Sequence, residues 1–239
     1  MRGVRPLALN TAIAWLFIVG SACFVLGAVP GYVSLVGTTA DGITFFVGSI
    51  FFTSASFAQL VQCQSPDMTR VDAQSQHVRA PVKLVAWLPR DDNWLAAVTQ
   101  FPGTLFFNST TFAALHEASS VTEQNHQVWR PDIYGSTLFL VASAFALMAL
   151  GGDALRWRGA SLPWRIAWIN MVGSVLFMAS AIGSYVLPDG EMVSETVDTV
   201  GTGLGALCFL WGAALMLSAW REAVTHGGHH RRMRRRSHS

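Results

Sequence analysis

Long apolar runs are the feature that most constrains the fold of this chain of 239 residues. A helix needs about 20 consecutive apolar residues to cross a bilayer. Only 13% of the residues are charged, and the charges fall between the apolar runs. Because lipid offers no hydrogen-bonding partner to an exposed backbone, such runs have to be helical. The pattern therefore predicts an all-α, polytopic membrane protein.

Six runs are predicted to span the membrane. Five are clear from hydropathy, and the third is weaker because Gln100, Pro102 and Asn108 interrupt it. Hydropathy alone leaves this third run open between a span and an amphipathic surface helix. The predicted spans are residues 11–29, 43–62, 94–115, 135–151, 164–187 and 200–220, forming a single membrane domain over 1–239 that ends in a basic tail at 221–239.

The basic residues predict the orientation, because Lys and Arg concentrate in cytoplasmic loops. With six spans, 15 of the 16 lysines and arginines fall on one side and only Arg130 on the other. Removing the third span would place Arg156, Arg158 and the basic tail outside. We therefore expect six spans, with both termini cytoplasmic.

A short repeat recurs in the predicted spans, with the pattern glycine, serine or threonine, two variable residues, and phenylalanine. The fourth span is aligned as Ala142-Ser143, with Ala146 in place of the aromatic residue. Small residues allow apolar helices to pack closely in lipid, so we expect three related helical hairpins. The predicted packing residues are Gly20, Gly48, Gly103, Gly173, Gly205, Phe24, Phe52, Phe107, Phe177 and Phe209.

Four longer strings carry a family resemblance. They are Gln100 to Asn108 (QFPGTLFFN), Trp129 to Asp132 (WRPD), Asn170 to Ser174 (NMVGS) and Gly205 to Phe209 (GALCF). The chain resembles bacterial multi-pass proteins that carry YrhK-like segments, over most of both halves. The resemblance implies a protein of the bacterial inner membrane, in a family with no established activity.

Two sets of polar residues are candidate sites. His116, Glu123 and His126, in the predicted outer loop between the third and fourth spans, have side chains that suit zinc, although their spacing is not a known zinc signature; a solvated polar loop is favoured. Gln100, Asn108 and Asn170 could line a cavity, although hydrogen bonding between helices explains them more simply.

No Asp, Glu, Lys, Arg or His lies well inside a predicted span, which argues against a proton- or ion-coupled transporter. No known catalytic or cofactor-binding motif has a suitable context, so we expect no catalytic residue and no cofactor. The basic tail is expected to contact anionic lipid headgroups rather than nucleic acid. The favoured function is packing against or organising other membrane components, with a membrane-protein partner or a second copy. The alternatives are a facilitator for a small neutral solute or lipid and a metal-dependent membrane enzyme.

Overall fold

The structure is a computed structural model that describes residues 5–65, 81–116, 118–154 and 161–236, with side chains described as far as Ser218. This part of the chain is all-helical, as predicted, apart from a single antiparallel bridge between Val186 and Met192. Five helices are long and apolar enough to cross a membrane. Arg2, Arg70, Arg79, Arg156 and Arg158, which carry part of the predicted charge asymmetry, lie outside the described residues.

Six long helices make up the described fold. The third, α5, is as long as α1, at 22 residues, but it is more polar and contains Pro102. A short helix, α2 (Tyr32–Val36), follows α1, and α6 (Val121–Gln124) leads through a π-helical turn (Asn125–Trp129) straight into α7. The long helices are α1 (Pro6–Gly27), α3 (Thr38–Cys63), α5 (Asp92–Ala113), α7 (Arg130–Met148), α8 (Leu162–Gly183) and α9 (Glu195–Arg236).

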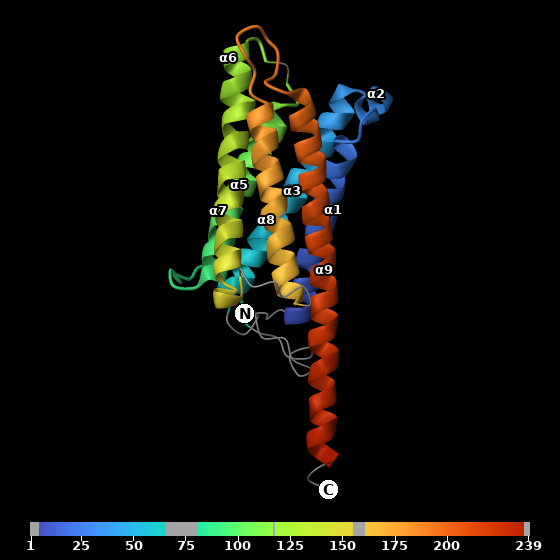
Figure 1. Ribbon diagram of the computed structural model, residues 1–239, viewed down its shortest axis with the longest axis vertical. Coiled ribbons are helices and arrows are strands. Elements are labelled where there is room, and N and C mark those ends of the chain that lie inside the picture. The colour runs from blue at the N-terminus through green and yellow to red at the C-terminus, as the bar shows by residue number, and fades with distance from the viewer. Residues whose placement is uncertain (1–4, 66–80, 117, 155–160, 237–239) are drawn as a thin grey trace.

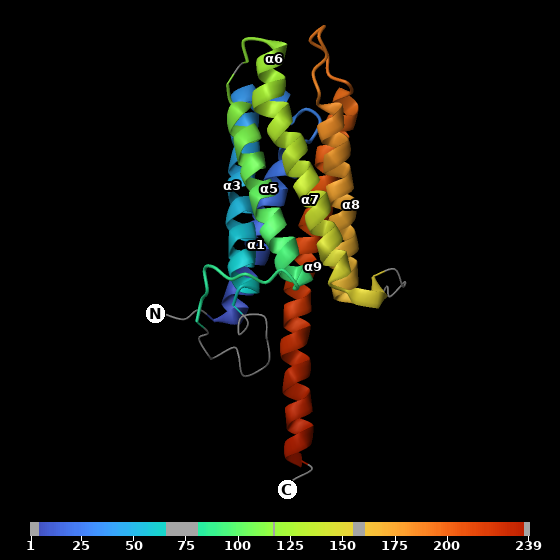
Figure 2. The ribbon, with the colours of Figure 1, turned by 90° about the vertical axis from the view of Figure 1, so that its left-hand side faces the viewer.

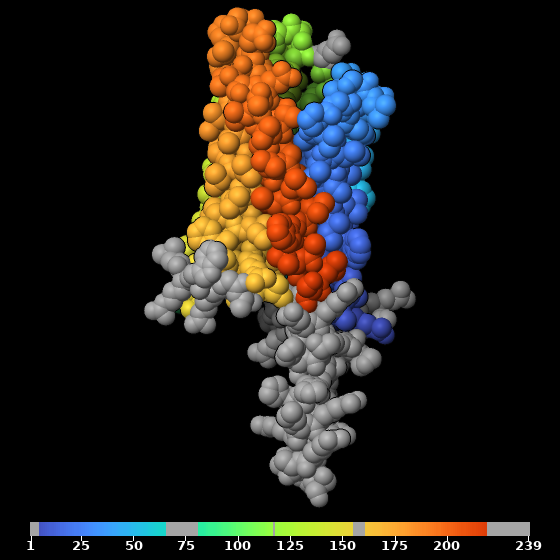
Figure 3. All heavy atoms as spheres, turned by 45° about the vertical axis from the view of Figure 1, so that its right-hand side comes forward, coloured from blue at the N-terminus to red at the C-terminus, as the bar shows by residue number. Residues whose placement is uncertain are grey.

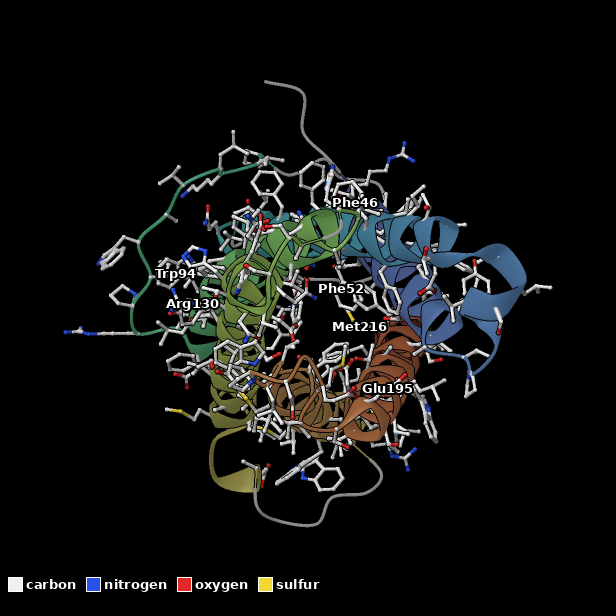
Figure 4. The ribbon with its side chains drawn as sticks, turned by 90° about the horizontal axis from the view of Figure 1, so that it is seen from above. Phe46, Phe52, Trp94, Arg130, Glu195 and Met216 are labelled. Atoms are coloured by element: carbon white, nitrogen blue, oxygen red, sulfur yellow. The ribbon has the colours of Figure 1, made fainter. Side chains whose placement is uncertain are left out.

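The six helices form a closed ring. Each contacts the next in the order α1, α3, α5, α7, α8 and α9, and α9 returns to contact α1 (Figures 1 and 4). One end of the ring carries α2, α6 and the loop 184–194, and we call it the α6 end (Figures 1 and 2). The described start of α1 and the end of α9 lie at the opposite end, the termini end.

The glycines of the repeat bring neighbouring helices into backbone contact. A Cβ atom built on Gly20 would lie 2.9 Å from the carbonyl oxygen of Gly48, and one on Gly48 would lie 3.0 Å from that of Gly20. Gly173 and Gly205 are related in the same way, at 3.1 Å in both directions. Helices α1 and α3, and α8 and α9, therefore pack as closely as the small residues allow.

The fourth copy of the repeat is not where the sequence alignment put it. The fourth glycine is Gly135, whose Cβ would lie 3.1 Å from the carbonyl oxygen of Gly103, and the fourth aromatic residue is Phe139. The prediction of Ala146 at this position is wrong because the span was started at Gly135, whereas α7 begins at Arg130. All six long helices therefore carry the glycine and the phenylalanine.

The six phenylalanines fill the centre of the ring. Neighbouring ring centroids lie 5.1 to 6.4 Å apart, mostly in edge-to-face contacts. The void left between them measures about 10 Å³, at the lower limit of what one water molecule needs. We call Phe24, Phe52, Phe107, Phe139, Phe177 and Phe209 the phenylalanine plug; Phe52 is labelled inside the ring in Figure 4.

The plug has two layers because neighbouring helices are antiparallel. Each phenylalanine follows its glycine by four residues, a rise of about 6 Å along the helix. In α1, α5 and α8, which run toward the α6 end, this rise places Phe24, Phe107 and Phe177 on the α6 side. The phenylalanines of α3, α7 and α9 lie on the side of the termini.

Candidate functional site

A cavity of about 640 Å³ lies above the phenylalanine plug, at the α6 end. Phe24, Phe107 and Phe177 form its floor, and residues of all six long helices line its walls. Its volume falls within the roughly 300–1,000 Å³ that is usual for small-molecule sites. Figure 3 shows this end of the molecule hollowed between the orange loop before α9 and the blue α2.

The lining of the cavity is acidic. Four carboxylates line it, and the described lining contains no lysine, arginine or histidine. The acidic residues come from three helices that are far apart in the sequence, so only the closed ring brings them together. They are Asp41 of α3, Asp132 of α7, and Glu195 and Asp198 of α9.

Close packing of α8 against α9 builds one corner of the cavity. A Cβ atom on Gly201 would lie 2.8 Å from the carbonyl oxygen of Leu176, so only glycine permits this approach. As a result, the Ser180 hydroxyl donates a hydrogen bond of 2.7 Å to Asp198 Oδ1 and lies 2.7 Å from the Thr202 hydroxyl. Because Ser180 has a single proton and gives it to Asp198, Thr202 is the donor in the second bond.

The π-helical turn before α7 positions the second carboxylate. π-turns frequently occur at functional sites, and this one places Val128 and Trp129 on the cavity wall one turn before Asp132. Its backbone is held by Thr110, which donates to the Val128 carbonyl at 2.5 Å, and the Trp129 indole donates to the Ala181 carbonyl at 2.8 Å. The Asp132 carboxyl lines the same cavity as that of Asp198.

Asp41 faces the cavity from the other side of the ring, in the first turn of α3. Acidic residues are favoured there by the positive end of the helix dipole. The Oδ1 atom of Asp41 is enclosed, yet it has no hydrogen-bond partner among the described residues. Phe24 and Phe45 also line the cavity, and their rings meet edge to face at 5.4 Å. This wall therefore combines an unsatisfied carboxylate oxygen with aromatic surface.

Asp132 and Asp198 lie in the first turns of α7 and α9, near the starts of two candidate spans. The candidate spans of the structure are residues 121–148 and 195–218, and each begins well before the corresponding predicted span. Apolar-run boundaries stop at charged residues, which is why both aspartates were assigned to loops. Polar groups that converge on one cavity are the usual mark of a candidate binding site.

The predicted metal residues are not brought together. Glu123 accepts hydrogen bonds from the backbone and hydroxyl of Ser119 and from Gln127, at 3.0 Å for the last. The ring of His116 packs against Phe112 at 5.4 Å. His126 is exposed in the π-helical turn. Within the described part of the chain, no three His, Cys, Asp or Glu side chains are close enough together to hold a metal ion.

The predicted cavity residues lie away from the cavity. The amide oxygen of Asn108 accepts a hydrogen bond of 3.1 Å from Thr53 of α3. Asn170 packs against α9, where a Cβ on Gly212 would lie 2.5 Å from Asn170 Oδ1. Gln100 is half-buried in α5. None of the three lines the cavity above the plug.

The cavity can accommodate an organic molecule that carries positive charge. Carboxylates supply the charge complement, and aromatic rings attract cations through their faces. The cavity ends at the phenylalanine plug, so the described residues leave no continuous opening along the axis of the ring. No family model, no curated protein and no solved structure matches this chain.

Proposed function

We propose that this chain is a six-span protein of the bacterial inner membrane that binds a small organic cation in the acidic cavity, which faces outward. The single observation that carries the proposal is the lining of the cavity, with four carboxylates, several aromatic rings and no basic side chain among its described residues. Packing or partner binding, and kinship with proteins that carry YrhK-like segments, stay predictions.

Support for six spans comes from α5, which lies between α3 and α7 in the ring and carries the same repeat as the other long helices. Support for an outward-facing cavity comes from charge. The described basic residues Arg5, Lys83, Arg90 and Arg165 belong to segments at the termini end, and Arg130 lies near the α6 end. Such an asymmetry is typical of a cytoplasmic termini end.

An organic cation suits the cavity better than a metal ion. A metal ion needs several ligands converging within about 2 to 2.6 Å, whereas no three acidic or other metal-ligating side chains converge in the described residues. The cavity is also far larger than a metal ion, and its floor is made of phenylalanine rings. A quaternary or protonated amine could contact these rings while its charge is balanced by Asp132 and Asp198.

The plug makes binding, rather than open conduction, the proposed activity. Two layers of aromatic side chains separate the cavity from the termini end, with a void of about 10 Å³ between them. A hydrated solute cannot pass such a barrier unless the rings move. The proposed protein therefore holds its ligand at the outer face in this conformation.

Choline and its neutral isostere 3,3-dimethylbutan-1-ol provide the test, because they differ in charge but hardly in shape. Choline should raise the melting temperature of the detergent-purified protein saturably, since a ligand that binds only the folded state stabilises it. The alcohol should not. Because close charge pairs couple by about 1.5 kcal/mol or more, Asp132→Asn or Asp198→Asn should weaken choline binding at least about tenfold.

Asp189→Asn is the matched control. Asp189 is exposed in the loop at the same end of the ring, outside the cavity lining, and its contact with the Glu191 backbone can be kept by asparagine. This variant should bind choline as the unmodified protein does. Equal stabilisation by choline and the neutral alcohol, or stabilisation by Mg²⁺ but not by choline, would contradict the proposed function.

A further inference from the structure

We infer that the cavity takes amphiphilic amines from the outer leaflet of the bilayer, through a mouth between α2 and the start of α9. This inference rests on the proposed function and names its ligand class: a cationic head with an alkyl tail. It is carried by the position of the mouth, by apolar side chains that belong both to the mouth and to the lipid-facing surface, and by the uneven distribution of charge in the cavity.

The mouth is marked by residues that line the cavity and are also exposed. Three apolar ones are Val29 (46% exposed), Val33 (41%) and Met192 (40%). Val29 and Val33 flank the turn between α1 and α2, and Met192 lies in the loop before α9. Figure 3 shows the hollow between these two parts of the chain. The rim therefore presents apolar surface at the place where a ligand would enter.

The seam between α1 and α9 is closed below this mouth. A Cβ atom on Gly203 would lie 3.3 Å from that of Ala28, so the two helices are in van der Waals contact there. Ala28 is 9% exposed, whereas its neighbour Val29 is 46% exposed. The opening is thus confined to the region beyond Ala28, next to α2.

Val29 connects the cavity to the lipid-facing side of α1. Exposed apolar residues recur along α1 at helical spacing and so share its outer surface, and Val29 follows two residues after the helix ends. We call Trp15, Val19, Leu26 and Val29 the stripe; each is more than a third exposed. An alkyl tail lying in the outer leaflet could follow this stripe to the mouth without crossing polar surface.

The cavity itself is amphipathic. Three of the four carboxylates come from α7 and α9, and Asp41 lies on α3, whereas α1 and the two residues after it contribute no charged side chain, only Phe24, Gly27, Ala28 and Val29. A cationic head would bind the acidic side, with its tail leaving along α1. Glu195, exposed at the rim, would attract the head on approach. A fully hydrophilic cation gains nothing from the α1 side, so the lining favours an amphiphile.

The test compares trimethylammonium compounds with methyl, butyl and octyl tails, using the full chain in lipid nanodiscs. Each should displace radiolabelled butyltrimethylammonium, so that partitioning into lipid is separated from specific binding. Because each buried methylene contributes about 0.8 kcal/mol, affinity should rise by up to about fourfold per methylene over the first carbons. The octyl compound should bind at least 30-fold more tightly than tetramethylammonium.

Variants of the rim show whether the tail uses the mouth. Val33→Asn with Met192→Asn should lower the affinity for the octyl compound about tenfold more than that for tetramethylammonium. Val193→Asn, next to the rim but outside the cavity lining, is the control and should change neither. The inference would be overturned if the octyl compound bound no more tightly than tetramethylammonium, or if the rim variants weakened the binding of both compounds equally. If tetramethylammonium fails to bind and Asp132→Asn has no effect, the proposed function itself fails.

Discussion

Gly173 and Gly205 face each other so closely that a Cβ atom on either would lie 3.1 Å from the carbonyl oxygen of the other. The contact joins α8 to α9 at the level of the phenylalanine plug, and Gly20 and Gly48 make the corresponding contact between α1 and α3. The backbones cannot separate locally, because aromatic rings pack directly beside each contact. Each glycine is therefore a position where an added methyl group has to displace a helix.

Alanine at these glycines should destabilise the protein. Gly48→Ala would place Cβ 2.8 Å from Cys23 Cβ, and Gly205→Ala would place it 3.1 Å from the Gly173 oxygen. Overpacking of this kind costs about 1–3 kcal/mol, so thermal unfolding in detergent should occur at lower temperature. Gly152→Ala is the control, since nothing in the described part of the chain lies within 4 Å of its added Cβ. An equal fall in melting temperature for the three variants would mean that the glycines of the repeat do not hold the helices together.

The assignment of Phe139 to the fourth copy of the repeat predicts a large loss of stability when its ring is removed. Phe139 is 2% exposed and its ring contacts those of Phe52, Phe107 and Phe209. Phe139→Ala should therefore cost about 3–5 kcal/mol, as Phe52→Ala should. Phe145→Ala, in the same helix but half-buried, should cost clearly less. The measurement is again thermal unfolding in detergent, and a larger loss at Phe145 would contradict the alignment.

The fold was largely predictable from sequence because its signals are local. Apolar runs predict the all-helical structure, and the repeat predicts packing positions at Gly20, Gly48 and their equivalents, which lie in close helix contacts. Phe139 was missed because its glycine, Gly135, lies five residues into the helix, whereas the predicted span began there. The helix started earlier because Arg130, Pro131 and Asp132 belong to its first turn, where a proline and an acidic residue are favourable.

The cavity could not be predicted in the same way. Asp41, Asp132 and Asp198 lie on three separate helices, and nothing in their sequence spacing indicates that they share one space. The bond from Ser180 to Asp198 depends on the close approach that Gly201 allows between α8 and α9. Only the order of helices around the ring brings these side chains together.

At the α6 end, the side chain of Asn125 joins the π-helical turn to the loop 184–194. Its side chain donates to the Val186 carbonyl at 2.7 Å and accepts from the Val186 backbone amide at 3.0 Å. Asn125→Ala should remove both bonds, so the amide of Val186 should exchange its hydrogen faster, which hydrogen exchange with mass spectrometry can measure. Gln127→Ala, in the same π-helical turn but bonded to Glu123 instead, should leave exchange at Val186 unchanged.

Thiol reagents of opposite charge should reveal the acidity of the cavity. In a chain whose three cysteines are replaced by serine, Thr199→Cys would place a thiol on the cavity wall. A trimethylammonium methanethiosulfonate should modify it at least about tenfold faster than the sulfonate analogue, because an acidic cleft concentrates cations. At Ser34→Cys, exposed on α2 outside the lining, the two rates should be closer. A faster reaction of the anionic reagent at Thr199→Cys would contradict an acidic cavity.

Reporter fusions should give a consistent topology. Fusions after Asp41, Glu123 and Glu191 should report the outside, and those after Asp72, Asp153 and the tail should report the cytoplasm, because Lys and Arg concentrate in cytoplasmic loops. The fusion after Glu123 is decisive for α5, the most polar of the long helices before α9. A cytoplasmic signal there would remove α5 from the spanning helices.

The contact between α1 and α9 sets an order for assembly. These helices are the first and the last of the six to leave the ribosome, yet they are neighbours in the ring. The earlier helices can pair as they emerge, since α1 with α3 and α5 with α7 meet through their own glycines. The ring closes only when α9 arrives, and α9 brings two of the four carboxylates with it. A nascent chain that stops before Glu195 therefore has paired helices but neither a sealed wall nor the acidic corner, so the capacity to bind a cation should appear in one step, late in biosynthesis.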